Sequence, residues 1–478
     1  MAKPILTSQD TDFPQWYQDV VAKAELAENG PARGTIVIRP YGYRIWELLQ
    51  QILDERIKAT GHENAYFPLF IPMSFLEREA DHVEGFSPEL AVVTHGGGKE
   101  LGEPLVVRPT SETVINHTFS RWIQSHRDLP VLINQWANVV RWELRPRLFL
   151  RTTEFLWQEG HTAHATSEEA QEETLKMLGV YRDVVRESLA IAALTGEKSP
   201  AERFAGADRT FTVEGMMRDG KALQMGTSHD LGQNFAKAFD IVFAAEDGSE
   251  HHVWQTSWGV STRLVGAVIM AHGDDFGLRL PPAIAPYQVV VMPLGGDDAQ
   301  STVEAAMQLV RDLEAAGHRV KLDDRLHVGF GRRAVDWELK GVPVRVEIGP
   351  RDLESGTAVV VRRDTREKAS VELERLIQTI GERLVEIQQA LLDETEAQRL
   401  TRTSLISDLD EFKSTIAAEP GLYVAGWCGS ASCEEAFGDG TGASIRCIDP
   451  FEELPGSEPR CLACDNLASH QAVIAKAY

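Results

Sequence analysis

The 478-residue sequence has no long hydrophobic run, no excess of positive charge and no cysteine before residue 428. Its longest apolar run, Leu264 to Ala271, has about eight residues, whereas a membrane-spanning helix needs about twenty. The first twelve residues also lack the apolar core of a signal peptide. We therefore expect a cytoplasmic protein without a membrane anchor.

Basic side chains are scarce, since 48 Lys and Arg stand against 72 Asp and Glu, for a net charge of −24. This balance argues against a protein that coats DNA nonspecifically, because neutralising phosphates requires basic side chains to dominate the contact surface. The net charge does not show, however, how the charged residues are distributed along the chain or over the surface. Residues 311–368 carry 13 Lys and Arg against 11 Asp and Glu, so the acidic excess lies elsewhere.

All five cysteines lie between Cys428 and Cys464. In a cytosolic protein this clustering predicts metal binding rather than disulfides. The pairs Cys428-x4-Cys433 and Cys461-x2-Cys464 could supply four thiolates to one structural zinc, with no open catalytic position. Cys447, between the pairs, is predicted to be a buried free thiol. The alternative is four cysteines without a metal.

The length predicts roughly three domains at about 150 residues each. Residues 43–58 have helical periodicity, and short aromatic and β-branched runs over 105–280 predict a largely antiparallel sheet with flanking helices. After the prolines near residue 285, strands and helices alternate, which predicts a small α/β domain. A charged helix over 372–400 then leads to the cysteine-bearing tail. The predicted domains are 1–284 (α+β), 285–400 (α/β) and 401–478 (α/β, zinc-binding).

Two segments combine arginine with glutamate and aromatic residues. Arg141-Trp-Glu143 is predicted to end a strand over 139–143, and Arg151-Thr-Thr-Glu-Phe155 to follow a short loop, so that both arginines and the phenyl ring share one face of a hairpin. Arg263 stands where a glycine-containing turn enters an apolar helix. Guanidinium groups bind phosphate through a planar fork, and a phenyl ring can stack on a base. The two segments together predict a nucleoside triphosphate site, although each arginine alone could be a surface charge.

These segments resemble the second and third signature motifs of class II aminoacyl-tRNA synthetases. Pro68, in the apolar segment 65–71 that is predicted to form a strand, resembles the first motif, which forms the dimer interface of that class. The prolyl-tRNA synthetase family fits best. Its motifs are similar to Arg108-Pro-Thr-Ser-Glu112, FLRTTEFLWQEGH over 149–161 and WGVSTR over 258–263.

The resemblance extends to the rest of the chain. The α/β segment is similar to the family's anticodon-binding domain. The tail resembles the archaeal/eukaryotic-type branch through Trp427-Cys428-Gly429, Cys433-Glu434, Thr441-Gly-Ala443 and the final Ala-Tyr.

The resemblance implies a homodimeric ligase that activates proline with ATP and then acylates the 3′ end of proline tRNA. Arg141 would bridge the proline carboxylate and the α-phosphate, while Arg151 and Arg263 would hold the β- and γ-phosphates with Mg²⁺. The implied ATP-binding residues are Arg141, Glu143, Arg151, Phe155, Gln224, Thr227, Ser261, Thr262 and Arg263. The implied proline-binding residues are Thr110, Glu112, Arg141, Trp157, Glu159, His161, Phe204, Thr227 and His229. Zn²⁺ would be structural, held by Cys428, Cys433, Cys461 and Cys464.

Only about 108 residues separate Phe155 from Arg263, which leaves no room for the large editing insertion of bacterial-type prolyl enzymes. A pocket for a small apolar ring discriminates poorly against similar volumes, so alanine and cysteine could enter it. We therefore expect no editing of mischarged alanine within this chain.

Other interpretations stay open from the residues alone. A threonyl, glycyl or seryl enzyme of the same class is one; the Thr110 and Glu112 loop and the Trp157–Glu159–His161 spacing favour proline, and a threonyl enzyme would be expected to use cysteine in its catalytic domain. A noncatalytic RNA-binding paralogue is another, but it predicts lost phosphate arginines. Trp157 and Phe204 could also be core residues. Basic side chains in the α/β segment are candidates for contacts to RNA, and the alternative for each is a solvated surface charge. These candidates are Arg332, Arg333, Lys340, Arg345, Arg351, Arg362 and Arg363.

Overall fold

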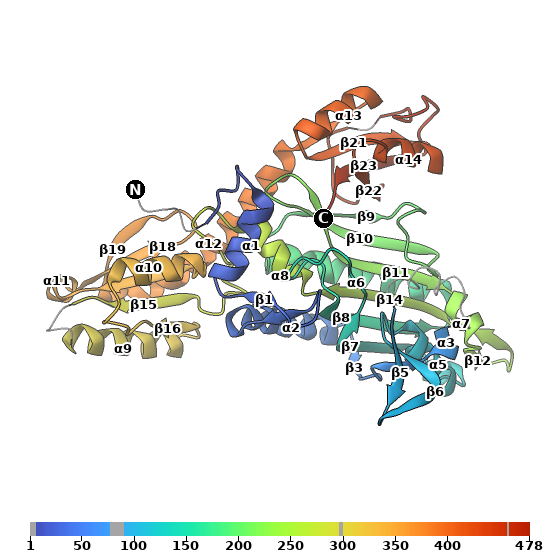
Figure 1. Ribbon diagram of the computed structural model, residues 1–478, viewed down its shortest axis with the longest axis horizontal. Helices are drawn as coiled ribbons and strands as arrows, with labels where there is room; N and C mark the ends of the chain where they lie inside the picture. The colour runs from blue at the N-terminus through green and yellow to red at the C-terminus, as the bar shows by residue number, and fades with distance from the viewer. Residues whose placement is uncertain (1–5, 77–89, 296–299, 457) are drawn as a thin grey trace.

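The computed structural model describes residues 6–76, 90–295, 300–456 and 458–478. Within these residues the two largest sheets have 11 and five strands. Figure 1 shows the five-stranded sheet with its helices at one end of the molecule and the large sheet at the other, with the C-terminal strands of the large sheet at the top of the view. No helix in these ranges is both long enough and apolar enough to cross a bilayer.

The large sheet is almost entirely antiparallel, since only its two end pairs, β20–β21 and β3–β7, are parallel. This arrangement confirms the predicted antiparallel sheet with flanking helices. In sheet order its strands are β20 (Thr403–Leu405), β21 (Leu422–Trp427), β23 (His470–Lys476), β22 (Ala443–Ile448), β9 (Ala193–Glu197), β10 (Arg209–Met216), β11 (Ala222–Gly232), β14 (Trp254–Ser261), β8 (Glu154–His164), β7 (Val131–Val140) and β3 (Glu63–Asn64).

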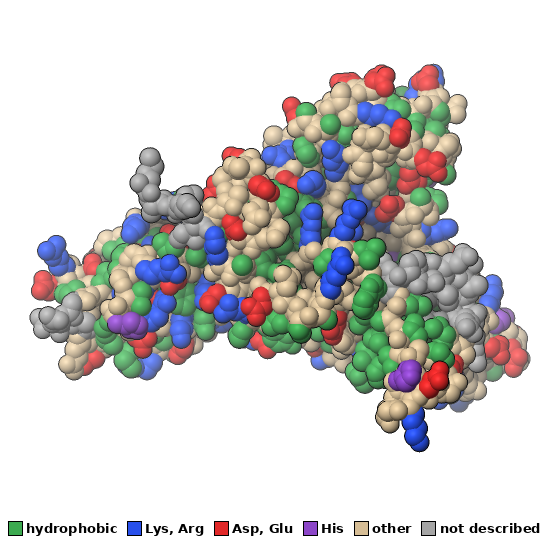
Figure 2. Space-filling model, in the orientation of Figure 1, with side chains coloured by type: hydrophobic (Ala, Val, Ile, Leu, Met, Phe, Trp, Pro, Cys, Tyr) green, Lys and Arg blue, Asp and Glu red, His purple; other side chains and the backbone are tan. Residues whose placement is uncertain are grey.

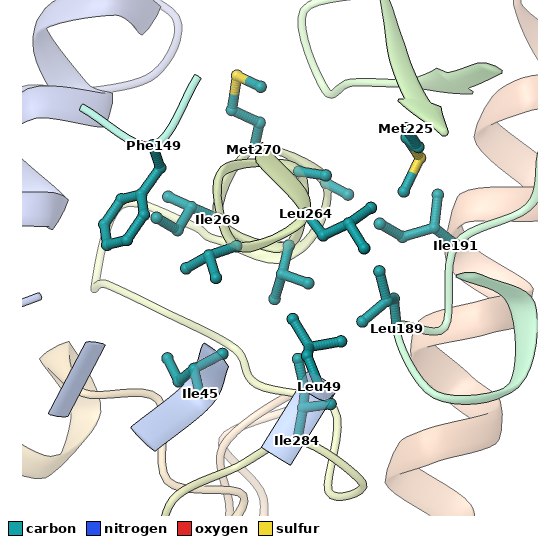
Figure 3. Packing of buried hydrophobic residues seen from close by; sticks show 14 of the residues in the cluster. Ile45, Leu49, Phe149, Leu189, Ile191, Met225, Leu264, Ile269, Met270 and Ile284 are labelled. Carbon is teal, nitrogen blue, oxygen red and sulfur yellow. The ribbon is translucent and has the colours of Figure 1, made fainter. Parts of the chain in front are cut away.

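Three helices build the main core against this sheet. Helix α6 (Ser167–Glu187) begins with a capping box between Thr166 and Glu169 and packs on β10, β11 and β14. Helix α2 (Pro40–Ala59) confirms the predicted helix over 43–58. Helix α8 (Arg263–His272) is almost wholly apolar, and Figure 3 shows it surrounded by aliphatic side chains from several segments. Full burial of one such side chain stabilises the fold by about 1.5–3 kcal/mol.

Two predicted strands end earlier or are shorter than expected. The segment 65–71 is not one strand, because β3 ends at Asn64 and β4 (Phe70–Pro72) belongs to a separate three-stranded sheet with β6 (Lys99–Val107) and β5 (Ala91–Gly96). Pro68 lies between them and has no N–H group to donate to a ladder. Strand β7 ends at Val140, so Arg141 and Glu143 belong to the connection that follows it.

The five-stranded sheet confirms the predicted α/β alternation. Its strands, in order, are β16 (Val320–Leu322), β15 (Val289–Pro293), β17 (Val344–Ile348), β18 (Thr357–Arg362) and β19 (Lys368–Glu372), with the first three parallel. Strands β15 and β17 are buried throughout, as expected for central strands covered on both faces. The connecting helices are α9 (Gln300–Ala315), α10 (Phe330–Leu339) and α11 (Pro350–Glu354).

The long helix α12 (Leu376–Thr401) crosses from the five-stranded sheet to the C-terminal segment. There, strands β20 to β23 do not form a sheet of their own: β22 pairs with β9 at Ile448 and Glu197, so the tail continues the large sheet. The remaining elements are α1 (Phe13–Lys23), β1 (Ala27–Asn29), β2 (Ile36–Ile38), α3 (Met73–Leu76), α5 (Glu112–Trp122), η2 (His126–Asp128), α7 (Asn234–Ala238), β12 (Val242–Ala244), β13 (Glu250–His252), η3 (Leu373–Arg375), α13 (Leu409–Ala418) and α14 (Ala431–Gly438).

Candidate active site

A cavity of about 480 Å³ opens on the face of the large sheet that lies opposite helix α6. Strand β8 shows how the two faces are separated, because successive side chains of a strand point to opposite faces. Phe155, Trp157, Glu159 and His161 line the cavity, whereas Gln158 accepts a hydrogen bond from Tyr181 of α6. The four cavity residues therefore form a row from an aromatic ring to an acid and an imidazole.

One end of the cavity is strongly basic. The guanidinium of Arg141 lies 5.6 Å from the ring of Phe155 and 5.4 Å from that of Trp157, and its Nε donates to the carbonyl of Pro109 at 3.0 Å. Arg263, the first residue of α8, and Arg151 line the same end. Burial and the nearby charges of Arg151 and Arg141 lower the pKa of Arg263 to about 10.

This crowding of like charge requires a counter-charge, because burial weakens the screening of charged groups by water. A polyphosphate supplies several anionic oxygens that guanidinium groups bind with two hydrogen bonds each. Figure 2 shows Lys and Arg side chains gathered near the centre of the drawn face, between the C-terminal segment and the rest of the molecule. The arginine end is thus suited to a nucleoside triphosphate.

The other end of the cavity is acidic and buried. The carboxylate of Glu159, which is 2% exposed, accepts hydrogen bonds from the Ser111 hydroxyl and from Gln135 Nε2 at 2.8 Å, and lies 3.0 Å from His161 Nε2. The buried Glu112 accepts a hydrogen bond from the Thr110 hydroxyl. Burial alone would lower the pKa of His161, but its hydrogen bond to Glu159 and the charge of Glu112 raise it. This end can accept hydrogen bonds from an ammonium group.

An aromatic and neutral wall closes the acidic end. The Phe204 ring stacks on the His229 ring with centroids 4.6 Å apart. Burial lowers the pKa of His229 to about 4, so this imidazole is neutral near pH 7. Thr210 holds both residues, since its hydroxyl lies 3.0 Å from His229 Nδ1 and accepts from the backbone N–H of Phe204 at 3.1 Å. The wall therefore presents two stacked, uncharged rings at this end of the cavity.

The structure brings together nearly all the predicted site residues. The residues that line the cavity are Thr110, Glu112, Arg141, Glu143, Arg151, Phe155, Trp157, Glu159, His161, Phe204, Gln224, Thr227, His229, Ser261 and Arg263. Thr262 does not line it, because it is buried at the end of β14, where its N–H donates to the carbonyl of Leu156 at 3.0 Å. The individual roles given to these residues remain predictions.

Sequence reasoning missed several cavity residues. Thr210 could have been found, because it faces His229 across β10 and β11 and shares its face of the sheet. Ser111 does not line the cavity, but its hydroxyl donates to the Glu159 carboxylate, and it could have been inferred from its place between Thr110 and Glu112. Glu202 lies in an irregular loop, and no periodic pattern pointed to it.

Arg108 belongs to the predicted motif but, unlike Thr110 and Glu112, does not line the cavity. Its guanidinium is buried and donates to the carbonyl of Phe67 at 2.6 Å and to that of Asn138 at 2.8 Å. These contacts tie β7 and the segment before β4 to the loop that carries Thr110. Arg108 therefore holds, from outside the cavity, the loop that carries Thr110 at its acidic end.

The four predicted metal ligands also lie together. The Sγ atoms of Cys428, Cys433, Cys461 and Cys464 are all within 4.8 Å of one another. Despite burial, a hydrogen bond from the backbone N–H of Ala463 and other backbone donors lowers the pKa of Cys461 to about 7, which favours the thiolate that binds metal. This donor set fits a tetrahedral zinc. Cys447 is fully buried and apart from the cluster, as predicted.

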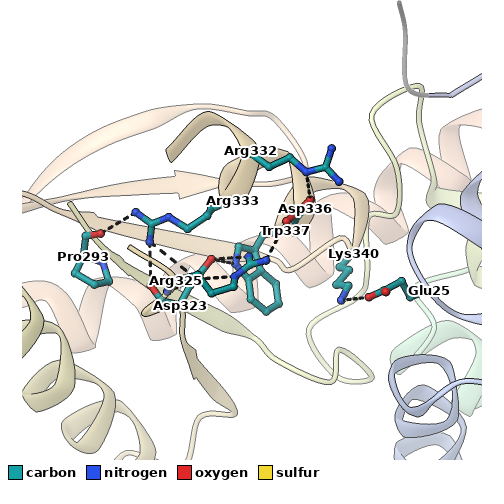
Figure 4. Close-up of polar contacts among 9 residues, drawn as sticks. All are labelled: Glu25, Pro293, Asp323, Arg325, Arg332, Arg333, Asp336, Trp337 and Lys340. Atoms are coloured by element: carbon teal, nitrogen blue, oxygen red, sulfur yellow. Dashed lines mark hydrogen bonds and ion pairs between the residues drawn. The ribbon is translucent and has the colours of Figure 1, made fainter. Parts of the chain in front are cut away.

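Several basic residues expected to contact RNA are engaged within the chain (Figure 4). Arg333 is buried and donates to the carbonyls of Asp323 at 3.0 Å and Pro293 at 3.1 Å, so it is neither a surface charge nor accessible to RNA. Lys340 pairs with Glu25 at 2.7 Å, which joins the five-stranded domain to the N-terminal segment. Of the arginines expected to contact RNA, Arg332 and Arg351 are exposed, and Arg332 is paired with Asp336 at 2.9 Å.

Comparisons with known proteins agree along the whole chain. Residues 93–272 match the model of the tRNA synthetase class II core domain (G, H, P, S and T), residues 288–383 the anticodon binding domain, and residues 409–478 the prolyl-tRNA synthetase C-terminal domain.

Full-length relatives are similar at high identity. The chain is 57% identical to "Proline--tRNA ligase 2" of Streptomyces avermitilis over 100% of both chains. It is 56% identical to "Proline--tRNA ligase" of Frankia alni, covering 96% of this chain and 98% of the relative. It is 53% identical to "Proline--tRNA ligase, chloroplastic/mitochondrial" of Arabidopsis thaliana, covering 99% and 88%. The chain therefore belongs to the prolyl-tRNA synthetase family of class II aminoacyl-tRNA synthetases.

Proposed function

We propose that this chain joins proline and ATP into prolyl-adenylate, with release of pyrophosphate, and then transfers proline to the 3′ end of proline tRNA. The observation that carries the proposal is that one cavity has both a basic and an acidic end, joined by the row of side chains on β8. Arg141 lies over both Phe155 and Trp157. It is therefore placed where the two substrates would meet.

The basic end would hold ATP. Arg151 and Arg263 would bind the β- and γ-phosphates, and the Phe155 ring would stack on adenine. Mg²⁺ would share the phosphate charge, and the Glu143 carboxylate beside Arg151 is an oxygen ligand suited to it. Supporting contacts would come from Gln224, Thr227 and Ser261, whereas Thr262, which does not line the cavity, would support the site only by preceding Arg263 at the start of α8.

The acidic end would hold proline. Its secondary ammonium needs acceptors, which the Thr110 hydroxyl and the Glu112 carboxylate supply, with Glu159 and His161 behind them. Its compact ring would lie against Trp157, Phe204, Thr227 and His229. Because His229 is neutral, this wall adds no positive charge next to the ammonium.

The chemistry then follows from placement. A carboxylate oxygen of proline attacks the α-phosphorus, the bond to the β-phosphate bridging oxygen breaks, and pyrophosphate leaves with that electron pair. In the second step the terminal hydroxyl of the tRNA attacks the adenylate carbonyl and loses its proton, the bond between the carbonyl carbon and the phosphate oxygen breaks, and AMP leaves with that electron pair. Neither step needs a covalent bond to the protein, so the arginines act by positioning and by neutralising developing charge.

The finer features of the family belong to this proposal. The four cysteines would hold a structural zinc, and the α/β domain would read the tRNA anticodon in the cytoplasm. Tyr66, which is 74% exposed, and Phe70 flank Pro68 and support a dimer interface there. Sedimentation of the purified chain at about twice its monomer mass would agree with this dimer; sedimentation as a monomer would not.

The chain is also proposed to lack editing. Residues 156–262, between Phe155 and Arg263, are occupied by β8, α6, β9, β10, β11 and β14, which form the large sheet and its covering helix, and by the short elements α7, β12 and β13. Purified enzyme should therefore leave alanyl-tRNA of the proline type intact. Rapid deacylation by this chain would contradict the proposal.

Amino-acid-dependent ATP–pyrophosphate exchange tests the activity directly. We expect exchange with proline to stand clear of the other nineteen amino acids, with weaker signals for alanine and cysteine because small apolar pockets discriminate poorly. Strong exchange with another amino acid and none with proline would overturn the proposal.

A further inference from the structure

The loop over residues 198–208 joins β9 to β10 and brings Glu202 and Phe204 to the acidic end of the cavity. All its residues are described, and they form neither helix nor strand. Phe204 keeps its place through its ring contact with His229 and its N–H bond to Thr210. Backbone hydrogen bonds fix the two ends of the loop, from Lys198 to the carbonyl of Thr210 at 2.7 Å and from Asp208 to that of Asp230 at 2.9 Å. Regions with few backbone hydrogen bonds open more readily than strands and helices, so side-chain contacts matter for the position of the residues between these ends.

The C-terminal segment holds the start of this loop. Glu434, in α14, accepts a hydrogen bond from the hydroxyl of Ser199, which is fully buried. Arg446, in β22, donates two hydrogen bonds of 3.1 Å to the carboxylate of Glu214 in β10. The same carboxylate accepts from Lys198 Nζ at 3.0 Å. Ser199 is therefore held directly by the C-terminal segment, whereas Lys198 is held by β10, through Glu214 and through its N–H bond to the carbonyl of Thr210 at 2.7 Å. Arg446 of the C-terminal segment binds the same Glu214 carboxylate.

The sheet explains why these side chains meet. Strand β22 lies beside β9, with Ile448 paired to Glu197. This close approach requires glycine at position 196, because a Cβ there would lie 2.9 Å from the Cβ of Cys447. On the same strand, Thr195 donates to the Glu452 carboxylate through both its N–H and its hydroxyl. Continuity of the sheet thus sets Arg446 and helix α14 at fixed positions beside the loop.

The charges at this junction favour one arrangement. Glu214, Lys198 and Arg446 are 3%, 3% and 7% exposed. Burial alone would raise the pKa of Glu214, but the charges of Lys198 and Arg446 lower it, so the carboxylate is ionised and paired on both sides. Buried ion pairs add little net stability compared with apolar packing, and in some proteins they specify position. Here the ion pairs of Glu214 with Lys198 and Arg446 fix the first residue of the loop, next to Ser199, which Glu434 holds.

We propose that Glu434 is a positioning residue for amino-acid binding. From the C-terminal segment it fixes Ser199, with the Arg446–Glu214–Lys198 cluster bracing the same loop start, and so keeps Phe204 against the bound amino acid. The inference rests on the proposed function, because it assigns the amino acid to the Phe204 end. Glu434 does not line the cavity, so it acts through the loop and affects one substrate only.

Steady-state pyrophosphate exchange separates the two substrates. In Glu434→Ala and in Ser199→Ala the KM for proline should rise about tenfold, as expected for one lost hydrogen bond to a charged group, while the KM for ATP stays within about twofold. The double variant should be no worse than either single variant, because both remove the same contact. Glu434→Gln keeps an acceptor oxygen and should restore most of the affinity. Glu435→Ala, an exposed neighbour on the same helix, should match the wild type.

Amide hydrogen exchange without substrates tests the loop independently of activity. Residues 199–208 should exchange faster in Glu434→Ala and Ser199→Ala than in the wild type and Glu435→Ala. Ser199 lies outside the cysteine-bearing segment, so shared behaviour excludes loss of the cysteine cluster as the cause. Unchanged loop exchange, or KM values for proline and ATP that rise together, would overturn the inference. If the wild type showed no proline-dependent pyrophosphate exchange, the proposed function would be refuted instead. Faster amide hydrogen exchange of the loop in the two variants would still support the role of the Glu434–Ser199 contact in holding the loop.

Discussion

Single side chains on β8 set the order of chemistry along the cavity. Phe155 stands at the arginine end, Trp157 follows under Arg141, and Glu159 and His161 lie at the acidic end. This order follows from the two-residue period of a strand, which the sequence already contains. It places the point where carboxylate and phosphate would react between two oppositely charged environments.

Arg141 should matter for activation and not for RNA binding. In Arg141→Ala we expect adenylate formation to fall at least about 100-fold, because one lost charge-stabilising donor in a water-poor site costs about that much. Binding of proline tRNA should stay within about twofold, since Arg141 is remote from the anticodon-binding domain in sequence and fold. Pyrophosphate exchange and tRNA titration measure the two effects. Arg145→Ala, an exposed arginine in the same connection, is the matched control. Lost tRNA binding with normal exchange would contradict the assigned role.

His161 should make stability depend on pH. Glu159 and Glu112 raise its pKa in the folded state above the ordinary value of 6.5, although burial opposes them. The protonated ring therefore stabilises the fold fully below about pH 6.5, and this contribution is lost as the pH rises through the raised folded pKa. The difference in melting temperature between the wild type and His161→Gln should favour the wild type most near pH 6 and shrink toward pH 8.5. A constant difference across this range would show that His161 does not titrate there.

At the scale of elements, short sequence motifs predicted the residues of the site but not the long-range strand pairing around it. The β7–β8 hairpin and Arg263 at the start of α8 follow from residue types within short segments. The family resemblance implies Thr262 as an ATP-binding residue, yet it lies outside the cavity that its neighbours Ser261 and Arg263 line. The pairing of β22 with β9 joins Ile448 to Glu197, which are 251 positions apart, and no local pattern encodes such a contact.

Strand packing makes Gly160 a sensitive position. Gly160 faces Trp258 across β8 and β14, and a Cβ would overlap the indole ring, which is buried. Gly160→Ala should therefore destabilise the protein by about 1–3 kcal/mol, the cost of overpacking a dense core. Urea unfolding followed by tryptophan fluorescence measures the change.

Helix α6 provides the opposite case. Gly179 lies in its interior, and no described atom comes within 4 Å of a Cβ built there. Gly179→Ala should stabilise the protein by up to about 1 kcal/mol, because glycine is a poor helix former. Equal effects of the two substitutions would show that the Trp258 contact does not determine the cost at position 160.

At the scale of the whole molecule, the charge of −24 coexists with a near-neutral RNA-binding candidate. The five-stranded domain has many basic residues, but several are committed to internal ion pairs, such as Arg362 with Asp364 at 2.7 Å and Arg363 with Asp274 at 2.6 Å. The second pair joins this domain to the end of the catalytic segment. An acidic chain with limited free basic charge fits a protein that must bind one RNA and release it.

The cysteine cluster should stabilise the C-terminal part of the shared sheet. Four thiolates fill one tetrahedral site, so purified protein should contain about one zinc per chain, and a strong chelator should release it and lower the melting temperature. Cys464→Ser removes one ligand and should lower both zinc content and stability. Cys447→Ala removes a buried thiol outside the cluster and should keep the full zinc content, which makes it the matched control. Because β22 pairs with β9, zinc loss should also speed amide exchange in β9. Metal-free protein with wild-type stability would refute the site.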